Sequence, residues 1–174
     1  MKGLKIYLPD SLDEESRGLA AKRFGLRRGS LSKAVQEALT QWVKRESKIE
    51  SKLNSMTMVA KNDGHAIAVI VFGSYARGDP SYNDVDIAIV FDGGGDTLSA
   101  LAKYSDLVTD KLGNPDALFD LSAFGDLPLY MRQRIIREGK AVYVGNEPEF
   151  YRLAVKTALD WSDFKPIFEE AVAA

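Results

Sequence analysis

The hydrophobic positions of the first 61 residues follow a helical spacing after a short alternating run. Residues 4–8 alternate apolar and polar side chains and predict a one-sided strand. Ser11 and Glu14 form a capping-box pattern that predicts the start of a helix, which we expect to end at Gly25. From residue 31 the apolar positions recur every three or four residues toward residue 61, which predicts a second, longer helix.

After the stop signal at residues 62–64, strand-like and helix-like patterns alternate. The run AIAVIVF is apolar on both faces, as is typical of a central strand with helices on both sides of its sheet. The whole pattern predicts an α/β (α+β) domain with a mixed sheet flanked by helices and preceded by a small strand-helix-helix module. The predicted strands are 66–72, 84–91, 116–121 and 141–144, and the helices are 96–112, 128–138 and one from Pro148 interrupted at Pro166.

Composition narrows the chemistry that this chain can perform. Of its 174 residues, 45% are hydrophobic and 28% are charged, which is typical of a folded protein. Because the longest apolar run, residues 66–72, is too short to span a bilayer, we expect a cytoplasmic protein with no membrane partner. With no cysteine and one histidine, any bound metal must be held mainly by oxygen, which favours Mg²⁺, Mn²⁺ or Ca²⁺.

The charge is distributed unevenly, although the formal net charge is only −2. Residues 1–46 contain ten Lys and Arg against six Asp and Glu, a net charge of +4, whereas the remainder contains 13 against 19, a net charge of −6. This asymmetry predicts two modules with different partners. We therefore expect a basic module at 1–46, a helical connector at 47–62, a main domain at 63–146 and a C-terminal helical extension at 147–174.

Strand, helix, basic turn and helix follow one another within the first 46 residues, and this order resembles the ribbon-helix-helix DNA-binding family. The module is too short to bury a core alone, so we expect a homodimer or a higher oligomer. The resemblance implies that Lys5 and Tyr7 point to bases and that Ser30, at the start of the second helix, holds a phosphate of operator DNA. The alternative is a dimerisation module whose basic side chains are only solvated.

The sequence FGSYARGDPSYNDVDIAIVF at residues 72–91 contains the main candidate for chemistry. Side chains two apart on a strand share a face, so Asp84 and Asp86 are expected to project together, and a divalent cation would relieve their repulsion. Gly73 and Ser74 follow a buried strand, where backbone N–H groups can bind phosphate, and Arg77 adds a bidentate phosphate donor. This combination predicts a site for a nucleoside triphosphate with magnesium.

This stretch resembles the signature of polymerase-β-like nucleotidyltransferases, in particular the minimal nucleotidyltransferase branch: a strand, Gly-Ser, Ala-Arg-Gly and Asp-x-Asp. The family implies a third carboxylate on a neighbouring strand. We expect Asp120 in this role, with Asp116 as the alternative, because DALFDLSAFGDLP resembles the downstream half of such domains. By resemblance, Asp84, Asp86 and Asp120 would bind two Mg²⁺ ions, and Gly73, Ser74 and Arg77 would hold the phosphates of ATP or another NTP.

The resemblance implies an enzyme that moves a nucleoside monophosphate, AMP from ATP, onto a hydroxyl acceptor. Small members of this branch are paired with helical HEPN-type toxins, which implies an antitoxin that modifies such a partner. The alternative is a ribbon-helix-helix transcriptional regulator in which the transferase-like domain serves as a sensor or a partner-binding surface. A third possibility is a purely structural partner in a complex.

Overall fold

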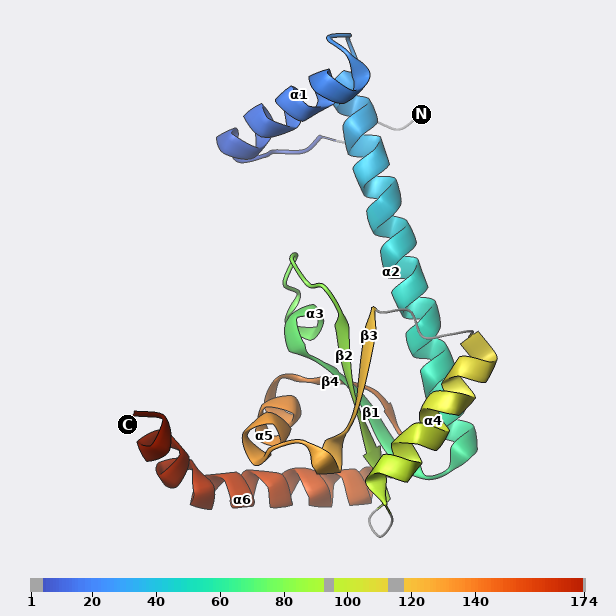
Figure 1. Cartoon of the computed structure of the whole chain (residues 1–174), viewed down its shortest axis with the longest axis vertical. Helices are drawn as coiled ribbons and strands as arrows, with labels where there is room; N and C mark the ends of the chain where they lie inside the picture. The colour runs from blue at the N-terminus through green and yellow to red at the C-terminus, as the bar shows by residue number, and fades with distance from the viewer. Residues whose placement is uncertain (1–4, 93–95, 113–117, 174) are drawn as a thin grey trace. The chain divides into compact units, whose positions relative to one another are not determined.

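The structure is a computed structural model that describes residues 5–92, 96–112 and 118–173. The chain divides into two compact units, residues 1–50 and residues 51–174. Figure 1 gives the labels of the helices and strands.

The first unit consists of α1, Asp10–Phe24, and the beginning of α2, Ser30–Asp63. Helix α1 begins directly after Pro9 with no side-chain cap, so the expected capping box is wrong: Ser11 lies inside the helix. The helix ends where expected, at Gly25, whose φ of 78° is accessible to glycine at little cost. Residues 5–9 have no assigned secondary structure. The strand expected at residues 4–8 is therefore not present in the described part of that segment.

Helix α2 is continuous over 34 residues and ends at Asp63, before the predicted stop at Gly64. Residues 47–62, the expected helical connector, lie within this helix. Within the second unit Met56, Val59 and Ala60 are buried, so this part of α2 belongs to a core rather than to an exposed linker.

The second unit is built on a four-stranded mixed sheet with the strand order β3-β2-β1-β4. Strand β1 pairs antiparallel with both β2 and β4, whereas β2 and β3 are parallel. The two central strands are nearly continuous runs of buried apolar side chains, as the sequence predicted. The bounds are β1 Ala66–Phe72, β2 Val85–Phe91, β3 Phe119–Ala123 and β4 Lys140–Val144.

Helices flank this sheet, so the expected fold class is confirmed (Figure 1). Helix α4, Thr97–Leu112, contacts β2 and β3, and its buried Tyr104 donates a hydrogen bond to the carbonyl oxygen of Met56 on α2 over 2.7 Å. Helices α5, Leu129–Glu138, and α6, Glu147–Ala173, contact each other and β1.

The course of α6 and the length and polarity of the helices complete the description of the second unit and of the helices. Helix α6 runs through Pro166, so the interruption expected there is not present. No helix in the described part of the chain is long and apolar enough to cross a membrane.

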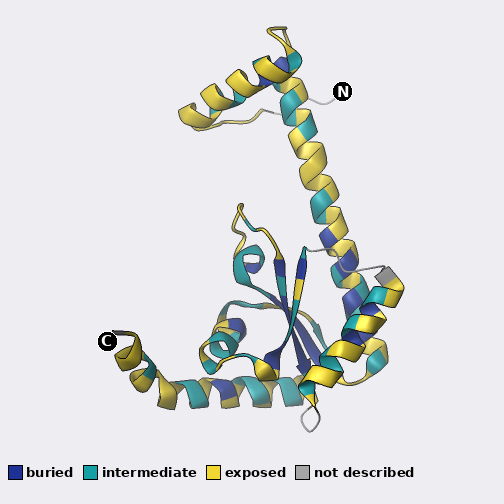
Figure 2. Ribbon diagram, viewed as in Figure 1, coloured by how far each residue is buried: buried dark blue, intermediate teal, exposed yellow. Residues whose placement is uncertain are grey.

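Buried side chains concentrate in the strands and in the helical segments packed on them (Figure 2). Ile87 and Ile89 of β2 are fully buried, as are Val69 of β1 and Phe124 of the short 3-10 helix Phe124–Asp126. Burying a side chain of this size stabilises the fold by about 1.5–3 kcal/mol. This packing holds in place the strand ends that carry the candidate site.

Candidate active site

A short helix, α3, Gly73–Arg77, follows β1 directly and begins the candidate site. Gly73 has a φ of 71°, which side-chain-bearing residues rarely adopt. A Cβ atom built at this position would lie 1.8 Å from Oδ2 of Asp86. Glycine is therefore required for two reasons, and its backbone approaches the Asp86 carboxylate more closely than any other residue could.

The carboxylates predicted from the sequence come from two neighbouring strands. Asp86 is the second residue of β2, and in the parallel register it is paired with Asp120 of β3. Asp84 lies just before β2 rather than within it and is exposed. Asp116, the alternative to Asp120, lies outside the described residues. The register thus brings Asp120 beside Asp86 although the two are 34 positions apart.

Electrostatics distinguish Asp86 from its neighbours. Partial burial raises the pKa of Asp86, the negative charges of Asp84 and Asp120 raise it further, and the Arg77 guanidinium opposes them. The ionised form of Asp86 is therefore disfavoured in the folded protein. A bound cation would reverse this penalty.

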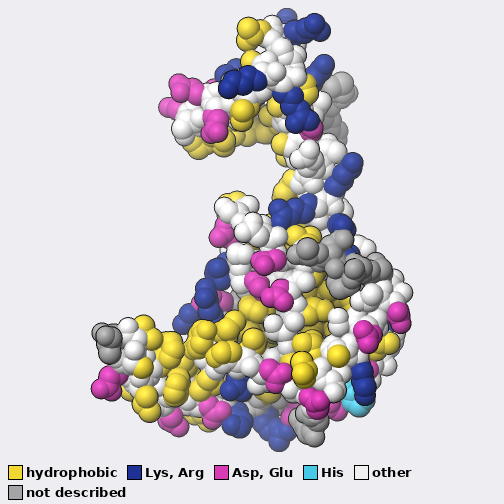
Figure 3. Space-filling view, in the orientation of Figure 1, with side chains coloured by type: hydrophobic (Ala, Val, Ile, Leu, Met, Phe, Trp, Pro, Cys, Tyr) yellow, Lys and Arg dark blue, Asp and Glu magenta, His cyan; other side chains and the backbone are white. Residues whose placement is uncertain are grey.

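The three carboxylates have the chemistry of a magnesium site, because hard cations prefer oxygen ligands. In the present side-chain positions, no group of three or more His, Cys, Asp or Glu residues in the described ranges is arranged to hold a metal ion. Acidic side chains gather over the first residues of β2 and β3, and basic ones gather near α3 and α5 (Figure 3).

A pocket of about 430 Å³ opens beside these strands. Its first wall consists of the end of β1, α3 and Asp86, so it contains the predicted phosphate-binding residues Gly73, Ser74 and Arg77. Its second wall comes from helix α5. The complete lining is Phe72, Gly73, Ser74, Arg77, Asp86, Tyr130, Met131, Arg134, Ile135 and Glu138.

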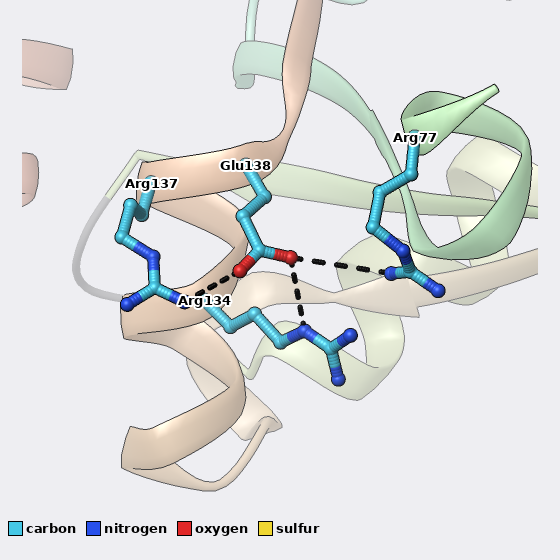
Figure 4. A network of polar contacts seen from close by, with 4 residues as sticks. All are labelled: Arg77, Arg134, Arg137 and Glu138. Carbon is cyan, nitrogen blue, oxygen red and sulfur yellow. Dashed lines mark hydrogen bonds and ion pairs between the residues drawn. The ribbon is translucent and has the colours of Figure 1, made fainter.

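Helix α5 contributes a charged network that the sequence pattern did not identify as part of the site (Figure 4). Arg134 donates from Nε to Oε2 of Glu138 over 3.1 Å, and Arg77 places Nη1 4.0 Å from the same oxygen. Arg137 donates to Oε1 over 2.5 Å. Hydrogen bonds from Arg137 and Arg134 lower the pKa of Glu138. From the sequence alone, the simplest interpretation of Arg134 and Arg137 is a solvated helix face, with a role in acceptor binding as the alternative, because their spacing carries no information about α3.

The residues predicted to bind DNA lie in the first unit. Lys5 and Tyr7 are both exposed, and the Lys5 Nζ lies 4.9 Å from the centre of the Tyr7 ring. Ser30 is buried; its hydroxyl lies 2.6 Å from the carbonyl oxygen of Gly25 and 2.9 Å from that of Arg27. Ser30 therefore stabilises the turn between α1 and α2, and the DNA-binding role of all three residues stays a prediction.

Comparisons with known proteins agree with this architecture. Residues 54–148 match the family model described as polymerase beta, nucleotidyltransferase. A protein of Methanocaldococcus jannaschii named "Putative protein adenylyltransferase" is 30% identical over 103 residues, which cover 59% of this chain and 75% of the relative.

Two solved structures share the fold at low sequence identity. A toxin–antitoxin complex with AMP-PNP contains a chain that is 20% identical, with a TM-score of 0.51 and coverage of 69% of this chain and 98% of that one. A MntA–HpeT toxin–antitoxin complex with two Asp-to-Glu substitutions gives 17% identity, a TM-score of 0.50 and coverage of 69% and 98%.

Proposed function

Because the chain belongs to the polymerase-β nucleotidyltransferase family, we propose that it transfers AMP from ATP to a hydroxyl group of a HEPN-type toxin partner and so acts as an antitoxin. The chain is a nucleotidyltransferase, and the proposal adds the nucleotide, the metal, the acceptor and the biological role. The choice of AMP is supported by the relative named as a protein adenylyltransferase. The choice of partner is supported by the toxin–antitoxin complexes that share its fold.

One observation carries the catalytic part of the proposal. Asp86 lines the same pocket as Ser74 and Arg77, and it lies beside Asp120 in the register of the sheet. Hydrogen-bond donors for phosphate and carboxylate ligands for a cation thus lie close together, as the triphosphate of an NTP and its magnesium require. Asp84, Asp86 and Asp120 would hold Mg²⁺, which supplies charge neutralisation at the phosphates and lowers the pKa of the attacking hydroxyl.

The side chains of the pocket have separate roles in the proposed transfer. Ser74 and the backbone around Gly73 bind the outer phosphates, and Arg77 offsets the charge that develops on the pyrophosphate leaving group. The acceptor oxygen forms a bond to the α-phosphorus while the bond between that phosphorus and the bridging oxygen breaks. Pyrophosphate leaves, and the hydroxyl proton of the acceptor is released to water.

Label transfer tests this proposal directly. The protein is co-expressed with a HEPN-type partner and incubated with Mg²⁺ and ATP labelled at either the α- or the γ-phosphate. We expect the partner to acquire label from α-labelled ATP only, and to acquire none when Asp86→Asn replaces the wild type. Asp92→Asn is the matched control, because Asp92 directly follows the other end of β2 and is exposed. Equal labelling by Asp86→Asn, or label from the γ-phosphate, would contradict the proposal.

DNA binding is a second candidate function, and it is favoured by the observation that residues 1–50 form a compact unit of their own. Residues 5–9 have no assigned secondary structure, and a groove of about 310 Å³ between α1 and α2 is lined in part by Leu19, Ala34 and Val35. A second copy could pair with this segment and form a ribbon for the major groove. The transferase domain would then be a sensor or partner-binding surface of a regulator.

A mobility-shift assay on the DNA upstream of the gene tests this second function across a series of salt concentrations. We expect binding that weakens steeply with salt and is lost in Lys5→Ala and Tyr7→Ala. Lys103→Ala, which removes a charge from the second unit, should bind like the wild type. Absence of binding at low salt, or equal binding by all variants, would exclude the DNA-binding function.

A further inference from the structure

We propose that Arg134 of α5 is a second phosphate-binding arginine of the nucleotide pocket, and that Glu138 orients its guanidinium group and that of Arg77. The ligand class is the polyphosphate of a nucleoside triphosphate. This inference rests on the proposed function, since it assigns a further residue to the same site.

The position of Arg134 is the first argument. It lines the pocket from α5, whereas Ser74 and Arg77 line it from α3. These two helices are contributed by segments more than 50 residues apart, and they contact each other in the fold. A phosphate chain in the pocket therefore has guanidinium groups available from two different elements.

The hydrogen bonding of Arg134 is the second argument. Its Nε donates to Oε2 of Glu138 over 3.1 Å, and its side chain is 56% exposed. A guanidinium group has five N–H donors, so this bond leaves the two terminal nitrogens to bind further acceptors. A guanidinium group that is fixed at Nε presents its terminal nitrogens as a fork, the geometry that suits two oxygens of one phosphate.

The balance of charge is the third argument. One carboxylate, Glu138, faces the three guanidinium groups of Arg77, Arg134 and Arg137 (Figure 4). Within this network the guanidinium groups outnumber the carboxylate by three to one, and the other carboxylate of the pocket, Asp86, belongs to the proposed cation site. The phosphate oxygens of a nucleotide would add the negative charge that the network lacks, whereas a neutral acceptor would not.

Arg137 provides a natural control for this inference. It also pairs with Glu138, but it is not among the residues that line the pocket. If the arginines of α5 only formed a solvated face, substituting Arg134 or Arg137 would have the same effect on nucleotide binding. If Arg134 binds phosphate, only its substitution weakens the binding of a triphosphate.

Isothermal titration of the full chain with a non-hydrolysable ATP analogue and with AMP, both with Mg²⁺, tests the inference. We expect Arg134→Gln to weaken binding of the analogue about 10- to 100-fold, as for loss of a charge-assisted bidentate contact. Binding of AMP should change less than about twofold, because AMP lacks the outer phosphates. Arg137→Gln should bind both ligands like the wild type, and Arg134→Lys should retain part of the affinity.

The outcomes separate this inference from the proposed function. Equal weakening by Arg134→Gln and Arg137→Gln, or equal loss of affinity for AMP and for the analogue, would overturn the phosphate role of Arg134. If the wild type transfers AMP and Arg134→Gln binds the analogue as tightly as the wild type does, the proposed function stands and only the inference is excluded. A wild type that binds no triphosphate would exclude both. If Arg134→Gln does not unfold cooperatively on heating, Arg134→Lys replaces it in each comparison.

Discussion

The two units of this protein use their apolar residues in opposite ways. In residues 51–174 the two central strands of the sheet, β1 and β2, are buried almost continuously, and Ile87 and Ile89 are inaccessible to solvent. In the described part of residues 1–50, only Ala20, Ser30 and Ile49 are buried, whereas Trp42 is 59% exposed. The second unit closes its own core, and the first unit does not.

This difference indicates where each unit obtains its stability. Hydrophobic stabilisation scales with the apolar area removed from water, so the sheet unit is stable through its internal packing. The exposed apolar positions of the first unit follow the helical pattern of its sequence, and they include Leu19, Leu39 and Trp42. Such positions are expected to be covered by another surface, for which we propose a second copy of the same unit.

The largest expected effect comes from substituting a glycine of the candidate site, and a second glycine with a similar φ separates damage to the site from backbone strain alone. Gly73→Ala should reduce AMP transfer about 100-fold, because its Cβ would collide with Oδ2 of Asp86 and displace this carboxylate. Gly64→Ala is the matched control: its φ of 73° is nearly the same, but a Cβ there meets no atom within 4 Å. Both variants should lose about 1–2 kcal/mol of stability in chemical unfolding. A Gly73→Ala variant with normal activity would contradict the proposed position of Asp86 in catalysis.

The next effect tests the difference in packing between the two units. Ile89→Ala should lower the free energy of unfolding by about 2–5 kcal/mol, because it leaves a cavity at a fully buried position of β2. Leu39→Ala removes a side chain of the first unit that is 41% exposed. It should change the free energy of unfolding of the monomer by less than about 0.5 kcal/mol. Urea denaturation at low protein concentration measures both. Similar losses in the two variants would show that the first unit has a core of its own.

Part of this architecture was predictable from the sequence because the relevant signals are local. The apolar run of β1, the glycine ends of α1 and α2, and the Gly-Ser and Asp-x-Asp motifs each depend on neighbours within a few residues. The register between β2 and β3 is not local, so the family resemblance rather than the pattern led to Asp120. Arg134 and Glu138 escaped prediction for the same reason, since only the folded chain brings α5 to α3.

Other expectations were wrong where a local signal competed with its surroundings. Ser11 and Glu14 match a capping box with Ser11 as the N-cap, but the helix begins at Asp10 with Pro9 as its N-cap, so both residues lie inside the helix. Pro166 suggested a break, but α6 continues through it. Residues 5–8 have no assigned secondary structure, although their alternation predicts a strand. Sequence periodicity identifies an extended segment, but it does not supply the partner.

A smaller effect concerns the proposed association of the first unit. Trp42→Asp should lower the mass measured by light scattering toward that of the monomer and leave AMP transfer unchanged, because a charge would be placed on the apolar face. Met58→Asp, at an exposed position of α2 in the second unit, is the matched control and should not change the mass. A monomeric wild type, or equal dissociation in both variants, would show that the exposed apolar side chains of the first unit do not mediate self-association.

The smallest effect comes from Glu138, whose network joins α3 to α5 within the second unit. Hydrogen bonds from Arg137 and Arg134 lower the pKa of Glu138, so its folded pKa is below its unfolded pKa. Its contribution to stability is therefore present above the unfolded pKa and is lost as the pH falls through the folded pKa. We expect the difference in melting temperature between wild type and Glu138→Gln to be small at pH 7, because the network is exposed, and to shrink as the pH falls below the unfolded pKa of Glu138. Arg137→Gln should show the same pH dependence, since it removes the main cause of the shift. A difference in melting temperature that grows as the pH falls would mean that folding does not lower the pKa of Glu138. That result would exclude Glu138 as the anion that holds these arginines in place.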